Sequence, residues 1–156
     1  VAAFFVATGY IGTNPVDDRD RLLAFYDDGE RLMEFLDWDD CRAMTQAGMT
    51  IGSHSEGHVH LKDLSDADAI GELVRSREII SRETGVPCRH FCCPFGREGI
   101  DYDPARHPGM AADAGYVSFL TGHRGANRQG ASVFDIRRDH FLANWGNYQL
   151  RYFLGA

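Results

Sequence analysis

The chain has 156 residues, of which 44% are hydrophobic, and a formal net charge of −7 at pH 7. This length and apolar content allow one domain with a substantial core, and we expect residues 1–156 to form a single domain. The acidic balance argues against a non-specific nucleic-acid binder, which needs a basic face, and no apolar run is long enough for a transmembrane helix.

The first predicted element is a strand. Residues 1–12 (VAAFFVATGYIG) begin with a continuous apolar run and end in glycines, which is typical of a buried parallel strand that enters a loop. A long charged connection follows, with a short helix expected over residues 19–26. Because an apolar strand opens the chain, we expect one edge of it to be uncovered and able to support self-association.

The central elements have clear end signals. Residues 37–47 are predicted to form a helix that begins at Asp37 as its cap and ends at Gly48. A short strand, MTIGSH, follows. Ser65 then begins a long helix whose apolar residues recur with helical spacing. This helix is expected to end at Gly85.

The second half of the chain repeats the alternation of strand and helix. The expected elements are strands over 89–96, 116–121 and 132–138, and helices over 104–114 and 145–154. Such alternation predicts an α/β fold with a parallel sheet or barrel and crossover helices. Chemistry in these folds lies at the carboxyl ends of strands, where His54, Pro94 and the residues after Thr121 are expected.

The four cysteines do not indicate a disulfide scaffold. Cys92 and Cys93 are adjacent, and Cys41 and Cys88 lie in apolar surroundings. We expect all four to be small core residues. The redox compartment of the protein stays open.

Three histidines stand close together in TIGSHSEGHVHL. His54 and His58 are four residues apart, and two imidazoles converging from a turn at a strand end suit a zinc site that keeps one position for water. The helical metalloprotease motif has the same histidine spacing, but the fit is poor because Glu56 does not directly follow the first histidine and Gly57 weakens a helix. A solvated histidine-rich loop is the alternative, and His60 is expected to support the ligands or to lie on the surface.

The order of motifs resembles the polysaccharide deacetylase family (carbohydrate esterase family 4, the nodulation-type chitooligosaccharide deacetylases). His54, Ser55 and His58 match its His-(Ser/Thr)-x-x-His motif, and AAFFVATGYIG is similar to its TFFV…G..IG strand. Pro94, Phe95 and Gly96 match its Pro-aromatic-Gly motif. The resemblance covers nearly the whole chain, including AGY at 114–116 and the late IRR.

The resemblance implies a deformed (β/α) barrel that holds a divalent metal, usually zinc, through an aspartate and two histidines. His54 and His58 would be the histidine ligands, and the reaction would remove N-acetyl groups from N-acetylglucosamine-containing polysaccharide or oligosaccharide. The metal would activate water and polarise the amide carbonyl, and the backbone N–H of Phe95 would stabilise the oxyanion. Pro94 and Phe95 would thereby contribute to the substrate site.

The chain departs from the family at the Thr-Phe-Asp-Asp-Gly motif, which supplies the base and the aspartate ligand. This motif should precede the first strand, so the barrel is expected to be incomplete at its N-terminus and the chain a fragment that is inactive alone. A similar stretch, FYDDG, contains Asp27 and Asp28 but lies after that strand. An acidic turn that caps a helix is the simpler interpretation of this stretch.

The remaining catalytic roles are assigned by chain order. Arg138, rather than Arg137, is expected to replace the arginine that orients the base, and His140 is the candidate general acid, with His123 as the alternative. Trp145 is expected to contact the sugar, although Trp145 and Tyr148 at helical spacing also suit packing. Exposed arginines and surface histidines are the structural alternatives.

The sequence is also compatible with two other functions. One is hydrolysis of small cyclic amides or imides by the same superfamily, because substrate contacts lie on loops. The other is a degenerate, non-catalytic domain that binds glycan or a partner. The resemblance implies a secreted or envelope-facing location, although some members are intracellular.

Overall fold

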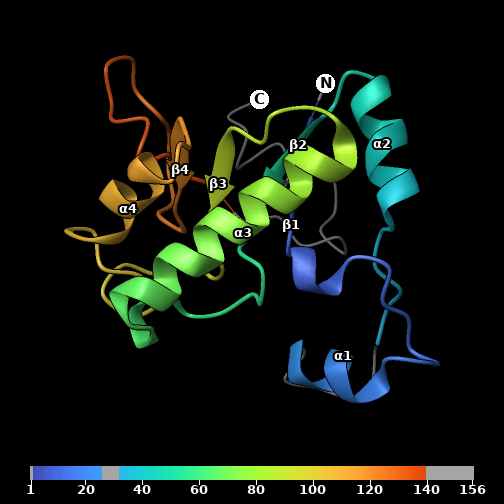
Figure 1. The fold of residues 1–156 in the computed structure, drawn as a ribbon. Coiled ribbons are helices and arrows are strands. Elements are labelled where there is room, and N and C mark those ends of the chain that lie inside the picture. The colour runs from blue at the N-terminus through green and yellow to red at the C-terminus, as the bar shows by residue number, and fades with distance from the viewer. Residues whose placement is uncertain (1, 26–31, 140–156) are drawn as a thin grey trace, which may run out of the picture.

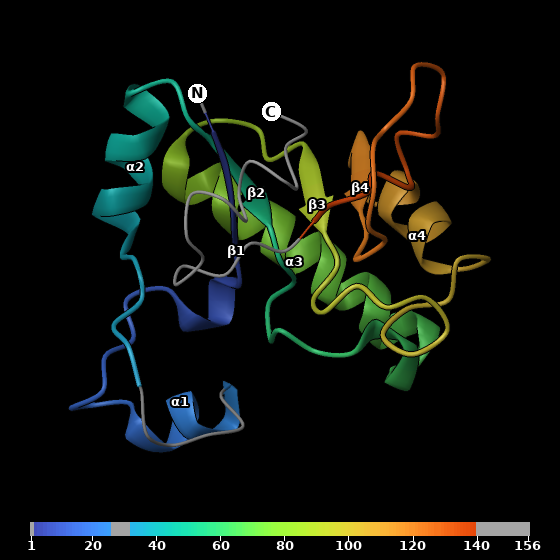
Figure 2. The same cartoon turned by 180° about the vertical axis from the view of Figure 1, so that it is seen from behind.

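The structure is a computed structural model, and it describes residues 2–25 and 32–139. Four parallel strands form one sheet in the order β1-β2-β3-β4: β1 (Ala3–Val6), β2 (Thr50–Ser53), β3 (His90–Cys92) and β4 (Ser118–Leu120). In Figures 1 and 2 the long helix α3 (Asp66–Thr84) crosses one face of this sheet, with α2 (Trp38–Gln46) beside β1 and β2 and α4 (His107–Asp113) beside β4. The described residues thus form the α/β part of an incomplete barrel.

The long central helices begin and end where the sequence predicts. Asp37 forms a capping box with Asp40 at the start of α2. The Ser65 hydroxyl accepts a hydrogen bond from the Asp68 backbone N–H at the start of α3, and Gly85 ends this helix in the left-handed conformation. Each cap satisfies backbone groups that lack partners within the helix. The predicted caps and ends of these two helices are therefore confirmed.

The core lies between the sheet and its helices. Phe91 and Phe119, on neighbouring strands, have ring centroids 5.3 Å apart and are fully buried. In α3 the buried positions are Ala69, Leu73, Ser76 and Ile80. Ile70 is one of the apolar residues of this helix, but 43% of it is exposed because the helix turns that position toward solvent.

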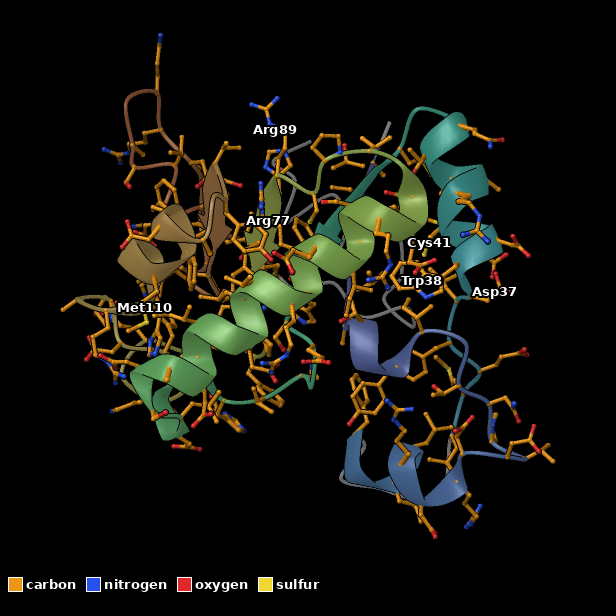
Figure 3. All side chains as sticks on the ribbon, in the orientation of Figure 1. Asp37, Trp38, Cys41, Arg77, Arg89 and Met110 are labelled. Carbon is orange, nitrogen blue, oxygen red and sulfur yellow. The ribbon has the colours of Figure 1, made fainter. Side chains whose placement is uncertain are left out.

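The four cysteines are buried and unpaired, which confirms the prediction that they are core residues. In Figure 3, Trp38 and Cys41 lie on the side of α2 that faces the long helix α3. Cys41 is fully buried, and Trp38 packs against the same core. Burial raises the pKa of Cys92 to about 11, so this thiol stays protonated and unreactive near neutral pH.

Two short elements follow β1. They are η1 (Thr8–Tyr10) and α1 (Arg19–Phe25), which agrees with the predicted short helix in the long connection. Tyr10 packs with Phe25 and Phe35, at centroid distances of 4.8 and 5.7 Å. A second 3₁₀ turn, η2 (Leu61–Asp63), lies just after the histidine-rich loop. Tyr10, Ala7 and Leu22 form a smaller core of their own beneath this connection.

A predicted strand and a predicted helix differ from the structure. The first strand is only partly buried: β1 pairs with β2 alone among the described residues, and 39% of Phe4 is exposed. The helix α4 begins at His107 rather than near residue 104, because the Asp103 carboxylate accepts the Ala105 N–H and holds a turn there. The predicted helix over 145–154 lies outside the described residues.

The predicted fifth strand is reduced to one parallel bridge between Leu120 and Ile136. Beyond that bridge, the side chain of Asn127, rather than a neighbouring strand, binds the backbone. Its Oδ1 accepts the N–H of Arg137 at 2.8 Å and its Nδ2 donates to the carbonyl of Arg137 at 2.9 Å. A side-chain amide therefore satisfies the backbone groups that a ladder would have used.

The helices within 2–25 and 32–139 do not combine the length and apolarity needed to cross a bilayer.

Candidate functional site

His54 lies where β2 ends and its backbone N–H still pairs with Val6 of β1, at 2.9 Å. Because side chains alternate along a strand, His54 points to the face opposite Ser53, whose hydroxyl bonds Ser76 of α3. His54 Nδ1 lies 2.6 Å from the carbonyl oxygen of Cys92. A carbonyl only accepts, so Nδ1 carries the proton and Nε2 keeps its lone pair.

His58 is presented by a tight turn. Ser55 and His58 both have positive φ angles, of 64° and 54°. The buried Ser55 hydroxyl accepts the N–H of His58 at 2.9 Å, which closes the turn. Non-glycine residues rarely adopt this conformation, and such strain persists only where the surroundings hold it.

A carboxylate from α3 holds the same turn. Glu72 Oε2 accepts the backbone N–H groups of Glu56 and Gly57, at 2.9 and 2.8 Å. Arg75 then bridges Glu56 and Glu72. The histidine-rich loop is thus fixed to the long helix by charge-assisted hydrogen bonds, which are stronger than neutral ones.

The rings of His54 and His58 converge. Their centroids lie 5.0 Å apart with an interplanar angle of 60°. Burial lowers the pKa of both rings to about 4, with smaller contributions from neighbouring histidines and Arg138. Both imidazoles are therefore neutral near pH 7, which is the form that binds a metal.

The pair fits part of a zinc site. Zinc–nitrogen bonds of about 2.0–2.1 Å in a tetrahedral arrangement place two ring centres about 5 Å apart. The hydrogen bond from His54 Nδ1 to a carbonyl is also typical of metal-ligating histidines. Within residues 2–25 and 32–139, however, no third histidine, cysteine, aspartate or glutamate joins them in a group able to hold a metal ion.

Phe95 lies beside these rings in the loop after β3. Its φ is 56°, and its ring contacts His58 edge-on at a centroid distance of 4.8 Å. Gly96 has a φ of 81°, and a Cβ built on it would lie 2.4 Å from the backbone nitrogen of Gly122. The Gly122 N–H donates to the Gly96 carbonyl at 2.7 Å, so the loops after β3 and β4 touch through their backbones.

Arg138 joins the same two loops. Its guanidinium donates to the carbonyls of Thr121 at 2.9 Å, Cys93 at 3.2 Å and Phe95 at 3.3 Å. Carbonyl groups thus take several of its donors, and the positive charge lies close enough to lower the pKa of both site histidines. Arg137 faces elsewhere, so the two adjacent arginines occupy different surroundings.

A network around Asp101 was not anticipated from the sequence. Asp101 is fully buried, accepts the Arg97 backbone N–H at 2.7 Å and contacts the Arg97 guanidinium. Its other oxygen lies 2.8 Å from His60 Nδ1. His60 in turn stacks on Phe95, with centroids 4.2 Å apart and planes within 7°. His60 is therefore part of the site, and the Arg97–Asp101 spacing was the only sequence signal for the network.

A hollow of about 420 Å³ adjoins the histidines. Three aromatic rings contribute to its wall, those of Tyr10, Phe25 and Phe95, together with the imidazoles of His58 and His60. Phe25 also packs on His58, at a centroid distance of 4.3 Å. The hollow combines apolar rings with polar groups that could orient a ligand, as small-molecule sites do.

The remaining predicted residues fall in two groups. His123 lies at the rim of a different hollow, where its Nε2 contacts Glu98 at 2.9 Å and its Nδ1 contacts Asp135 at 3.3 Å. Five other candidates lie outside the described residues: Asp27, Asp28, His140, Trp145 and Tyr148. The structure thus brings together His54, His58, Phe95 and Arg138.

Comparisons with known proteins agree with this architecture. Three similar solved structures are a deacetylase from Streptococcus pyogenes in complex with acetate, IcaB from Ammonifex degensii and a de-N-acetylase from Aggregatibacter actinomycetemcomitans. Their TM-scores are 0.72, 0.73 and 0.70, at identities of 18%, 17% and 18%. They match 97%, 99% and 97% of this chain, which spans 57%, 61% and 64% of their lengths.

The similarity to these structures concerns the fold. The family follows from a separate match: the family model described as "Polysaccharide deacetylase" covers residues 1–117, which is most of the chain. That range includes the strand β1, the histidine-rich loop and the loop that carries Phe95. This chain therefore belongs to the polysaccharide deacetylase family.

Proposed function

We propose that this chain is part of a metal-dependent hydrolase that removes N-acetyl groups from N-acetylglucosamine-containing polysaccharide. The observation that carries the proposal is the convergence of His54 and His58, 5.0 Å apart, beside the loop of Phe95. The family membership and the de-N-acetylase among the similar structures support the same reaction. The substrate and the metal are part of the proposal.

His54 and His58 would hold a divalent metal, with zinc the best match for two neutral imidazoles. When bound, such a metal lowers the pKa of its water and polarises the carbonyl to be attacked. The chain prepares the two ligands: the Cys92 carbonyl fixes the His54 tautomer, and the Ser55 and Glu72 contacts fix the turn of His58. This preparation leaves little reorganisation for metal binding.

The backbone N–H of Phe95 is the proposed donor to the oxyanion that forms on the acetamide. Arg138 holds the Phe95 carbonyl from one side, and His60 covers the Phe95 ring from the other. A donor fixed before the reaction stabilises developing charge more than one that must reorient. Arg138 therefore acts here as a positioning residue rather than as a group that transfers protons.

The hollow beside the histidines would receive the sugar. Its aromatic rings offer flat apolar faces, and Asp63 adds a carboxylate at its wall. A pyranose ring combines an apolar face with hydroxyl groups, so such a lining suits it. We therefore propose a poly- or oligosaccharide as the partner of this site.

The base and the third metal ligand would come from residues outside those described. The described residues hold only two histidine ligands, while the similar structures are longer chains of which this one spans 57–64%. A longer protein that contains residues 1–156 is thus the form in which we expect activity. Losing a general base alone lowers rates by about 10²- to 10⁴-fold.

The test measures zinc stoichiometry and acetate release from chitooligosaccharides in the longest available chain. His54→Ala and His58→Ala should each abolish stoichiometric zinc uptake and turnover. His90→Ala is the matched control, because His90 is a half-buried histidine on β3 that bonds Ser118. It should retain both properties.

Unchanged zinc stoichiometry in His54→Ala would refute the metal site. Turnover of small cyclic imides but not of chitooligosaccharides would assign the site to the alternative amidohydrolase function. Glycan binding without turnover, even with added zinc, would indicate a degenerate binding domain.

A further inference from the structure

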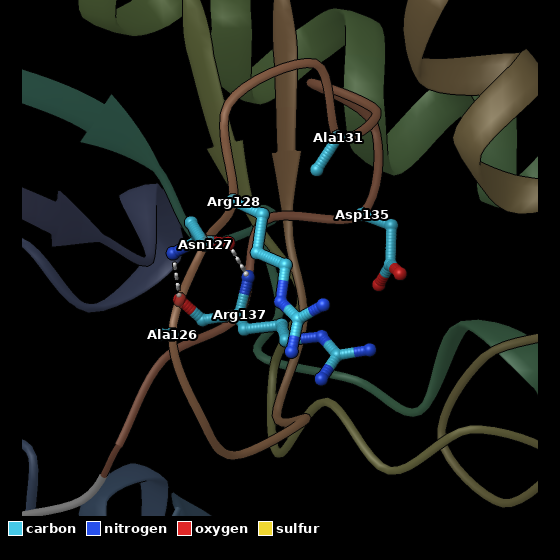
Figure 4. A pocket seen from close by; sticks show the side chains of 6 residues that line it. All are labelled: Ala126, Asn127, Arg128, Ala131, Asp135 and Arg137. Carbon is cyan, nitrogen blue, oxygen red and sulfur yellow. Dashed lines mark hydrogen bonds between the residues drawn. The ribbon is translucent and has the colours of Figure 1, made fainter.

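We propose that a second hollow, formed by residues 126–137, binds an anionic group, a carboxylate or a phosphate, carried by the glycan. This hollow has a volume of about 330 Å³ and is separate from the histidine site. Figure 4 shows the guanidinium groups of Arg128 and Arg137 extending side by side into it. Only one part of this inference rests on the proposed function, namely that the anionic group belongs to a glycan.

Hydrogen bonds to the backbone hold the two arginines next to each other. Asn127 binds both the N–H and the carbonyl of Arg137, which fixes residue 128 beside residue 137. The Ala131 N–H donates to the Arg128 carbonyl at 3.0 Å and closes the turn above them. Ala126 and Ala131 are small lining residues, which leaves space in front of the guanidinium groups.

The charges of this hollow are not balanced within the described residues. Among the described residues no carboxylate forms an ion pair with Arg128 or Arg137, although the chain has a formal net charge of −7. Arg19, Arg21, Arg77, Arg89 and Arg138 also lack such a partner there, but only Arg128 and Arg137 line this hollow together. Two guanidinium groups held together repel each other, and an anion between them removes that repulsion.

Asp135 also lines the hollow, and one oxygen of its carboxylate has partners outside it. Its Oδ1 accepts the Thr121 hydroxyl at 3.3 Å and contacts His123 Nδ1 at 3.3 Å. The lining thus sets two guanidinium groups against one carboxylate, and this excess of positive charge favours an anion. Two guanidinium forks suit carboxylate and phosphate oxygens better than hydroxyl groups, because they form paired charge-assisted hydrogen bonds.

The hollow is linked to the proposed catalytic site through adjacent residues. Arg137 lines the hollow, and Arg138 contacts the Phe95 carbonyl. A polymer that lies over both residues would place its reacting unit by Phe95 and a charged substituent by Arg137, which predicts a preference for acidic glycans over neutral ones.

The test is equilibrium binding, measured by titration calorimetry at two ionic strengths, so that no turnover is required. The probes are an oligogalacturonate hexasaccharide, a phosphorylated oligomannoside of equal length, the neutral chitin hexasaccharide and inorganic phosphate. The Arg128→Gln/Arg137→Gln variant is compared with Arg19→Gln/Arg89→Gln. The control removes the same net charge at two exposed arginines outside the hollow, and Figure 3 shows Arg89 projecting away from the ribbon.

We expect the Arg128→Gln/Arg137→Gln variant to bind one or both acidic glycans at least about tenfold more weakly, with a smaller salt dependence. The control variant should keep the wild-type affinity. Which acidic probe is affected identifies the group as carboxylate or phosphate. His54→Ala should retain this binding, so a failure of the deacetylase proposal would leave the result intact.

Three results would overturn the inference. They are equal losses in the two double variants, binding of inorganic phosphate without binding of either acidic glycan, and equal affinity for acidic and neutral oligosaccharides. Arg128 and Arg137 are exposed, so the circular dichroism spectrum and the melting temperature of the double variant should equal those of the wild type. This measurement verifies that the variant is folded.

Discussion

The loops that follow β2 and β3 are each held in a strained backbone conformation, but by different contacts. Each contains a non-glycine residue with positive φ at the site, His58 in one and Phe95 in the other. The first loop is held by Glu72, which reaches in from α3. The second is held by Asp101, which belongs to the same loop and also binds His60 of the first. The loop after β2 thus depends on a residue of α3. The loop after β3 is held by its own Asp101, which also binds the loop after β2.

The two halves of the site are therefore not equally independent. Removal of the Glu72 contacts should disturb only the turn of His58. Removal of Asp101 should disturb both loops, because its carboxylate connects them.

Acidification should act on the first loop most strongly. The pKa values of His54 and His58 are about 4 in the folded chain, against about 6.5 unfolded, so the unfolded chain binds more protons between these values. Stability should therefore be full above pH 6.5 and fall as the pH drops toward 4. Urea unfolding with a chelator present, at pH 7 and pH 4.5, measures this change.

A His54→Gln/His58→Gln variant is the control for that experiment, because glutamine cannot be protonated in this range. Its stability should fall less between pH 7 and pH 4.5. An equal fall in variant and wild type would show that other groups dominate the acid response.

Asp101→Ala should lower the free energy of unfolding by about 2–4 kcal/mol, because it removes charge-assisted hydrogen bonds from a fully buried carboxylate. It should also release His60 from Phe95. Urea unfolding gives the first quantity, and the ring-current shift of the His60 protons gives the second. A change in shifts confined to residues 97–101 would contradict the bridging role.

Glu72→Gln should cost less, about 1–2 kcal/mol, because one amide oxygen can still accept both N–H groups but lacks the negative charge that strengthens these bonds. The chemical shifts of His58 should change while those of Phe95 stay as in the wild type. Equal changes in both loops would show that Glu72 also supports the second loop.

Glu56→Gln should have the smallest effect, below about 1 kcal/mol. It removes the Arg75–Glu56 ion pair, whose side chains are 54% and 33% exposed, and exposed pairs contribute little. Thermal unfolding at low and high salt measures it. A loss as large as that of Glu72→Gln would mean that Arg75, rather than Glu72, holds the turn.

Much of the fold could be predicted because its signals are local. Asp37 and Ser65 mark helix starts with their own neighbours, and Gly85 marks an end. His54 and His58 could be predicted as a pair because they lie four positions apart, within one turn. Phe95 and Arg138 needed the order of family motifs, since nothing local links residues so far apart.

The supports of the site could not be predicted for the opposite reason. Glu72 binds backbone groups 15 and 16 residues away, and Asp101 meets His60 across 41 residues. Both look like ordinary surface acids in the sequence. The fifth strand was wrong because an amide side chain, that of Asn127, competes for the backbone of Arg137.

The backbone contact between Gly96 and Gly122 has a consequence for engineering. The carbonyl of one glycine and the N–H of the other meet at 2.7 Å, and a methyl group at Gly96 would collide with Gly122. Exchanging either segment alone with that of a homologue would have to reproduce this contact. Attempts to alter substrate range should therefore transplant the two segments together, as one cassette.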